Sequence, residues 1–253
     1  MNISLAPEVI FHIGSFPVTN SILTAWIAIG VLLIISLAAR FGLSQKTPKG
    51  LQTFLEMIIT FLYDMTESII GKKDLAKKLF PLLATFFFFI LVGSWIGLLP
   101  GVGSIGIWEH HDGQEVLIPL FRAPTSDLNA TIILALITMV TVQIIGLEAL
   151  GFKYFGKFLN FSGKTLFDRF LSLFVSILEG ISELSKIISF SFRLFGNIFA
   201  GEVLITVMTF LIPYIVPMPF LGFEIFVGLI QAFVFFALST VFISLAVQSH
   251  DAH

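Results

Sequence analysis

The chain has 253 residues, of which 57% are apolar and 12% are charged, whereas an ordinary soluble domain has roughly 45–50% apolar and about 25% charged residues. With 30 Phe and a mean hydropathy of +1.00, its apolar surface exceeds what one domain of this size can hide from water, so the surplus must face lipid. The formal charge of −2 argues against a nucleic-acid partner. The lack of Cys excludes disulfides, thiolate metal sites and cysteine nucleophiles.

The apolar runs predict a single polytopic membrane domain, because a helix needs about 20 mainly apolar residues to cross roughly 30 Å of hydrocarbon. We expect an all-α integral membrane protein with about five membrane helices and one interfacial amphipathic helix, the last two membrane helices forming a long, steeply tilted hairpin. The expected order is an outer N-terminus at 1–20, a first span at 21–39, the interfacial helix at 51–70, a second span at 79–99, an outer loop at 100–126, a third span at 128–150, a long tilted helix at 170–212 and a last helix at 220–248. The first basic residue, Arg40, follows the first apolar run, so this run lacks the charged start of a signal peptide and is expected to be retained.

The basic residues predict the orientation, because cytoplasmic loops carry an excess of Lys and Arg. All of them except Arg122, Lys186 and Arg193 flank the spans on one side. The loop at 100–126 has only Arg122 against three acidic residues, so it is assigned to the outer face. We therefore expect the N-terminus outside, the C-terminus in the cytoplasm, and a bacterial inner membrane as the location.

The stretch 170–212 contains no proline. As one helix it would be about 64 Å long, roughly twice the hydrocarbon thickness. A two-span hairpin would need a turn, but only isolated glycines are present, whereas Pro213 and the prolines that follow it offer a real stop. One helix tilted by about 60° is therefore favoured, and such a tilt lies outside the usual range, so a partner other than lipid must hold it.

Polar residues gather on one face of this predicted helix at about 100° per residue. The polar stripe, as we call this face, runs over about 27 Å. Glu202 lies nine residues beyond Arg193 and points to nearly the opposite face. The stripe consists of Glu179, Ser182, Lys186, Ser189, Arg193 and Asn197.

Several of these residues have a purely structural alternative. Glu183 and Lys186 are three apart and could form an ion pair on the helix surface near the inner interface. Each serine could bond its own backbone or permit close packing. Arg193 has no such explanation, because a buried arginine in a membrane costs about 2.5–3.5 kcal/mol or more and no acid lies three or four residues away. Its countercharge must come from another helix or another chain.

The residues around Arg193 match a known family. The run from Ser191 to Glu202, Ser-Phe-Arg-Leu-Phe-Gly-Asn-Ile-Phe-Ala-Gly-Glu, closely resembles subunit a of the F-type ATP synthase. Shorter matches extend over the chain, among them Gly97-Leu-Leu-Pro100 and Arg122-Ala-Pro-Thr-Ser-Asp-Leu-Asn129. The Arg-Leu-Phe-Gly-Asn core with an acid nine residues beyond the arginine is the specific part of this resemblance.

The resemblance implies a stator subunit beside a rotating ring of c subunits, each with a membrane-embedded carboxylate. It also implies b-type peripheral stalk subunits and the rest of the ATP synthase complex as partners, and no cofactor or metal. The family's essential arginine falls on Arg193, which would keep the facing ring carboxylate ionised and prevent protons from passing directly between two offset half-channels. The inner half-channel is expected to use Glu179, Ser182, Ser189 and, less clearly, Lys186.

The outer half-channel is expected to use Asn197, Glu202, Glu224, Gln231 and Asp127. Asp127 could instead merely cap the third span. If the turn between the last two helices centres near Pro217, Gln231 lies at about the depth of Glu202, and Glu224 lies about 10 Å closer to the outside. We expect the two glutamates to act as a coupled proton relay. Family members often have a histidine at one of these two positions, whereas this chain has glutamate at both.

Other assignments remain open at the level of the sequence. Glu148 is better explained as an interfacial group than as a proton carrier, and Glu109-His110-His111-Asp112 is better explained as a solvated loop than as a metal site. The alternative function is a standalone proton-coupled secondary transporter or channel, although the two halves show no convincing self-similarity. An intramembrane hydrolase lacks its motifs. The choice between H⁺ and Na⁺ depends mainly on the c subunit.

Overall fold

The computed structural model describes residues 6–42, 50–99, 105–111, 114–151, 154, 166–213 and 215–247. Within them, helices dominate and five are long and apolar enough to cross a membrane, which confirms the predicted all-α membrane class. The helices are α1 (Asn20–Gly42), α2 (Leu51–Ile70), α3 (Lys73–Gly97), the short 3-10 helix η2 (Pro124–Ser126), α4 (Leu128–Leu150), α5 (Leu166–Leu211) and α6 (Pro217–Val247). The fourth of these five, α5, is one continuous helix, and α2 is not among the five candidate spans.

Local signals in the sequence explain where these helices begin and end. Asp127 caps α4 by accepting a hydrogen bond from the backbone N–H of Asn129 at 2.9 Å. Gly71 ends α2 in the left-handed conformation at φ 70°, which a residue without a side chain adopts at no steric cost. Pro217 begins α6. The first turn of a helix tolerates proline because the backbone N–H groups there have no hydrogen-bond partner within the helix. Since α5 contains no proline, nothing interrupts it.

Helix α6 lies at the centre of the bundle, where it contacts α2, α3, α4 and α5. Its core is aromatic: Phe235 packs between Phe190 of α5, at 4.2 Å between ring centroids, and Phe86 of α3, at 5.6 Å. Phe236 is fully buried against Phe87 of α3. Phenylalanine rings carry a large apolar area and pack edge to face, so this layer fixes α5 relative to α3 and α6.

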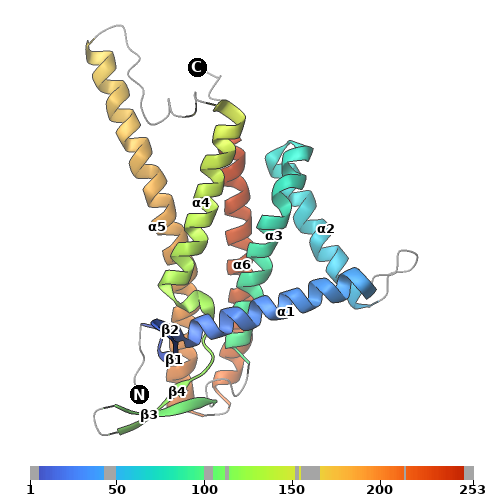
Figure 1. Ribbon diagram of the computed structural model, residues 1–253, viewed down its shortest axis with the longest axis vertical. Helices are drawn as coiled ribbons and strands as arrows, with labels where there is room; N and C mark the ends of the chain where they lie inside the picture. Colours follow the sequence, from blue (N-terminus) through green and yellow to red (C-terminus); the bar gives the residue numbers. More distant parts are fainter. Residues whose placement is uncertain are drawn as a thin grey trace.

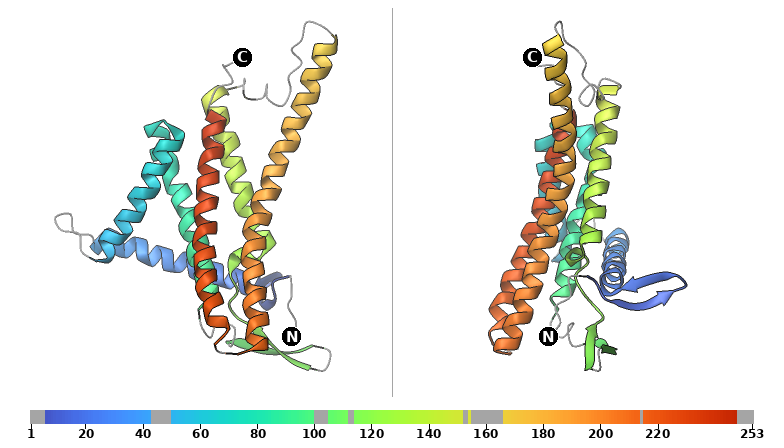
Figure 2. Two further views of the ribbon diagram at one scale, coloured as in Figure 1. Left: turned by 180° about the vertical axis from the view of Figure 1, so that it is seen from behind. Right: turned by 90° about the vertical axis from the view of Figure 1, so that its left-hand side faces the viewer.

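The two ends of the bundle differ (Figure 1). Both β-hairpins and the turn between α5 and α6 lie at the lower end in that view, and α6 ends at the opposite one. Helix α1 runs across the other long helices, while α5 and α6 run side by side as a hairpin, also visible in Figure 2. Because α5 has 46 residues, it is about 69 Å long, so it cannot stand upright in a bilayer and remain within it.

The structure corrects the sequence-based boundaries in three respects. The hairpin β1–β2 (Val9–Ile13 and Phe16–Thr19) occupies the N-terminal segment, and β3–β4 (Gly106–His111 and Gln114–Pro119) occupies the predicted outer loop. Helix α3 begins six residues earlier than the predicted second span, because the basic residues before residue 79 extend the helix instead of preceding it. The turn after α5 ends at Pro217 rather than centring on it.

Candidate functional site

Arg193 lies on the exposed face of α5. Ser182, Ser189 and Asn197 of the polar stripe are exposed beside it, while the opposite face buries Phe190 and Leu194 in the bundle. In the described part of the chain, Arg193 makes no hydrogen bond and no ion pair. The sequence predicted that no acid on its own helix neutralises Arg193. The structure shows that no described residue of the neighbouring helices does so either. An exposed arginine at this position of an apolar helix is costly in a membrane unless an anion lies beside it, and the described residues supply none.

The inner half of the polar stripe is divided between two environments. Ser182 is exposed and Glu179 is half-buried, whereas Lys186 turns inward. Its Nζ donates to Glu183 Oε1 at 2.8 Å and lies 5.6 Å from the Phe242 ring centroid on α6. The ion-pair alternative for Glu183 and Lys186 is thereby confirmed.

Further side chains connect this pair to α4. Gln143 Nε2 donates to Glu183 Oε2 at 3.3 Å, and Tyr154 Oη donates to Gln143 Oε1 at 2.7 Å. The Tyr154 ring lies against Gly146, where any added Cβ would collide with it. We call Gln143, Tyr154, Glu183 and Lys186 the inner clamp, because these four residues join α4 to α5.

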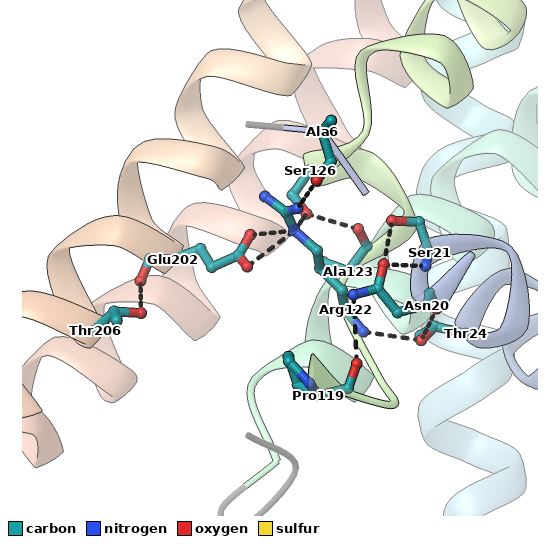
Figure 3. A network of polar contacts seen from close by, with 10 residues as sticks. All are labelled: Ala6, Asn20, Ser21, Thr24, Pro119, Arg122, Ala123, Ser126, Glu202 and Thr206. Atoms are coloured by element: carbon teal, nitrogen blue, oxygen red, sulfur yellow. Dashed lines mark hydrogen bonds and ion pairs between the residues drawn. The ribbon is translucent and has the colours of Figure 1, made fainter. Parts of the chain in front are cut away.

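Glu202 lies on another face of α5 from Arg193 and forms an ion pair with Arg122 (Figure 3). The distances from Arg122 Nε to the two carboxylate oxygens are 3.0 and 3.1 Å. The Arg122 side chain is only 6% exposed, against 38% for Glu202. The sequence predicted that Glu202 lies in a different environment from Arg193. The structure shows that Glu202 lies beside a buried guanidinium.

Glu224 and Gln231 are buried on one face of α6, as their spacing of seven residues predicts. The carboxyl group of Glu224 lies against Gly201 of α5, so closely that a Cβ on Gly201 would collide with it. Its Oε1 has no hydrogen-bond partner in the described residues. Glu224 thus lies at the depth of Gly201 and Glu202, and the predicted offset of about 10 Å between the two glutamates is wrong. The error arose because the turn was assumed to centre on Pro217.

The remaining candidates have structural partners. Asp127 caps α4, as the alternative explanation held, and is itself buried. Glu148 accepts a hydrogen bond from Lys78 Nζ at 2.7 Å, an exposed pair between α4 and α3. His110 and His111 lie on β3, and their side chains fall outside the described part of the structure. No cluster of three metal-ligating residues occurs among the residues that could be searched.

Two residues of the site were not assigned a role from the sequence. Arg122 was noted as the single basic residue of its loop and as the start of the family match that ends at Asn129, and neither observation reveals that its side chain is buried. Gly201 was noted only as part of the run ending at Glu202. No sequence pattern reveals that a carboxyl group on another helix lies against it.

Comparison with known proteins identifies the family of the chain. The model of the family described as ATP synthase A chain matches residues 22–244, a range that includes the Arg122 loop, α5 and all but the last three residues of α6. The chain is 33% identical, over 247 residues, to the ATP synthase subunit a of Moorella thermoacetica, and the match covers 96% of this chain and 98% of that one. This chain belongs to the ATP synthase subunit a family.

Proposed function

We propose that the chain is the proton-conducting stator subunit of an F-type ATP synthase, in which two offset half-channels deliver protons to, and remove them from, a carboxylate on a rotating c-ring. The observation that carries this proposal is Arg193, an exposed arginine on the longest apolar helix, without a partner among the described residues. A membrane carboxylate on a neighbouring subunit would supply the missing anion. The chain has no enzymatic activity of its own in this proposal.

The role of Arg193 follows from the chemistry of guanidinium, which remains protonated under all physiological conditions. Facing a ring carboxylate, it would favour the ionised form of that carboxylate as it passes from one half-channel to the other. A fixed positive charge between the half-channels would also repel protons and prevent their direct passage. Proton flow would then require rotation of the ring, which couples it to ATP synthesis.

The half-channels would lie on the two sides of Arg193 along α5. On the outer side, Asn197, Glu202, Glu224, Gln231 and Asp127 would line or border the passage. On the inner side, Glu179, Ser182 and Ser189 would line it, with Lys186 held at its edge by the inner clamp. The exposure of Ser182 and Ser189 supports this division.

The proposed partners are the c-ring, b-type peripheral stalk subunits and the other subunits of the complex, in a bacterial inner membrane. The N-terminus would face outward and the C-terminus the cytoplasm. Two features support this orientation: the distribution of Lys and Arg, and the location of both hairpins at the end of the bundle opposite the end of α6.

Purification from membranes tests the proposal against a standalone proton-coupled transporter or channel. A stator subunit copurifies with a c-ring and a soluble ATPase head and, reconstituted alone in liposomes, conducts no protons. A transporter or channel is active alone. Proton flux through the isolated chain, at a rate equal to that of the intact complex, would overturn the proposal.

A further inference from the structure

Arg122 is a buried charged residue whose side chain bonds to several segments of the chain (Figure 3). Besides Glu202, its Nε donates to Ser126 Oγ at 3.1 Å, and its Nη1 donates to the carbonyl of Ala6 at 3.2 Å. Its guanidinium carbon also lies 5.7 Å from the centroid of the Phe199 ring on α5. The one side chain therefore connects the N-terminal segment, η2 and α5.

The backbone around Arg122 is fixed as well. Its N–H donates to Thr24 Oγ1 of α1 at 3.1 Å, and Asn20 Nδ2 at the start of α1 donates to the carbonyl of Pro119 at 3.4 Å. Such anchoring fixes the backbone from which the Arg122 side chain extends, and the bonds of its guanidinium to Ser126, Glu202 and Ala6 fix the charged group. Since the side chain is 6% exposed, its charge is stabilised mainly by the Glu202 carboxylate, because an uncompensated buried charge is costly.

Glu224 is in the opposite situation. It is 4% exposed, and its Oε1 has no hydrogen-bond partner in the described part of the chain. The two glutamates are thus neighbours in depth but not equivalent, because one has a fixed countercharge and the other has none. Asp127, a buried carboxylate at the start of α4, is engaged with Asn129.

We propose that Arg122 is a positioning residue that holds Glu202 as its fixed counterion, and that Glu224 alone exchanges protons in the outer passage. This inference rests on the proposed function and replaces the serial relay through both glutamates that the sequence predicts. Glu202 then contributes a stationary negative charge that neutralises Arg122 beside the passage. It does not need to bind or release a proton during turnover.

A double-mutant cycle distinguishes a fixed ion pair from a proton relay. Removing both members of an ion pair preserves function if they only neutralise each other, whereas removing a member of a relay interrupts proton transfer. Removing one partner of a buried pair leaves the other uncompensated, whereas removing both is often nearly neutral. We therefore expect Arg122→Gln and Glu202→Gln each to slow ATP-driven proton pumping by about tenfold or more, and the double variant to recover to within about threefold of wild type. Rates are measured in inverted membrane vesicles and normalised to the amount of assembled complex.

The dependence of ATP synthesis on external pH is the second measurement. In the double variant it should match that of wild type, because the proton-exchanging group is intact, and in Glu224→Gln it should shift. Arg40→Gln is the matched control for Arg122→Gln, and Glu148→Gln is the matched control for Glu202→Gln, because each removes a charge of the same sign at an exposed position. Both controls should pump at the wild-type rate.

A double variant no faster than Glu202→Gln, or one with the same altered pH profile as Glu224→Gln, would show that Glu202 carries protons and would overturn the proposal. If the Gln variants fail to assemble, Arg122→Lys decides. It keeps the cation, so it should assemble and pump faster than Arg122→Gln with an unshifted pH profile; an Arg122→Lys variant as defective as Arg122→Gln contradicts the proposal. None of these outcomes resembles failure of the proposed function, which would show as pumping that does not require Arg193.

Discussion

At the scale of single residues, glutamates of the described structure differ in whether they form an ion pair. Glu183 is paired with Lys186, Glu148 with Lys78 and Glu202 with Arg122. Glu224 differs, because its closest described neighbour across the helix interface is the bare backbone of Gly201. A buried carboxyl group without an ionic partner is the group most easily protonated and deprotonated in a proton pathway.

Gly201→Ala should disturb Glu224 specifically, because the added methyl group would occupy the volume of its carboxyl group. We expect ATP-driven pumping to fall by about tenfold or more, since small displacements of a reacting group have large effects on rate. Combining Gly201→Ala with Glu224→Asp, whose side chain is one methylene shorter, should restore part of the rate. Vesicle acidification normalised to assembled complex measures both.

Gly222→Ala provides the matched control, because a Cβ at Gly222 meets nothing within 4 Å. It should leave pumping unchanged. If Gly201→Ala pumped as well as Gly222→Ala, the close approach of Glu224 to Gly201 would have no functional importance.

At the scale of elements, α5 carries different functions on its different faces. One face buries Phe190, Leu194 and Ile198 against the bundle, and another exposes Arg193 and Asn197. The inner clamp holds the inner half of α5 to α4, and the Arg122–Glu202 pair holds its outer half to η2 and the N-terminal segment. Two polar attachments at separate points therefore fix both the position and the rotation of the helix that presents Arg193.

Breaking the inner clamp should destabilise the protein rather than block a proton path. Lys186→Met leaves the Glu183 carboxylate, whose side chain is 12% exposed, without its cation, at an expected cost of about 1–3 kcal/mol. The double variant Lys186→Met, Glu183→Gln should recover most of that stability. Thermal inactivation of the detergent-solubilised complex measures the effect.

Lys78→Met is the control, because its pair with Glu148 is exposed at 62% and 54% and should contribute about 1 kcal/mol or less. A Lys186→Met complex as stable as wild type but unable to pump would instead assign Lys186 to the inner half-channel.

The exposed part of the polar stripe should be accessible to water from the inner side. The chain has no Cys, so single cysteines report on their surroundings without a background. Ser182→Cys and Ser189→Cys, both exposed, should react with a charged thiol reagent added from the cytoplasmic side, whereas Ser191→Cys, at a position that is 0% exposed, should not. Equal labelling of all three would contradict an aqueous passage along this face.

Much of this element-level organisation could be predicted from the sequence, for identifiable physical reasons. The lack of proline between residues 170 and 212 predicted a single helix, and the 3.6-residue period placed Glu202 away from Arg193. The register of the hairpin was wrong because prolines both stop helices and start them, and Pro217 starts one. The β-hairpins were missed although Gly14-Ser15 and Asp112-Gly113 are two-residue hairpin signals. Contacts between distant segments, such as Arg122 with Glu202, leave no periodic signal.

At the scale of the whole molecule, the arginines and lysines that lie within the apolar part of the bundle differ in how their charge is balanced. Arg122 and Lys186 both have a carboxylate in the same chain, but Arg193 does not in the part that the structure describes. Such an arrangement is incomplete for a protein that works alone. It is the expected surface of a subunit whose membership in the ATP synthase subunit a family implies a larger complex.

The most direct test of this account is ATP-driven acidification of inverted membrane vesicles that carry Arg193→Ala. The account predicts that the complex assembles and its soluble head hydrolyses ATP, but that acidification is lost, because nothing then controls the ionisation of the facing ring carboxylate. Arg40→Ala, which removes an arginine near the end of α1, should acidify normally. Arg193→Ala vesicles that acidify at the rate of Arg40→Ala vesicles, with equal amounts of assembled complex, would contradict the account.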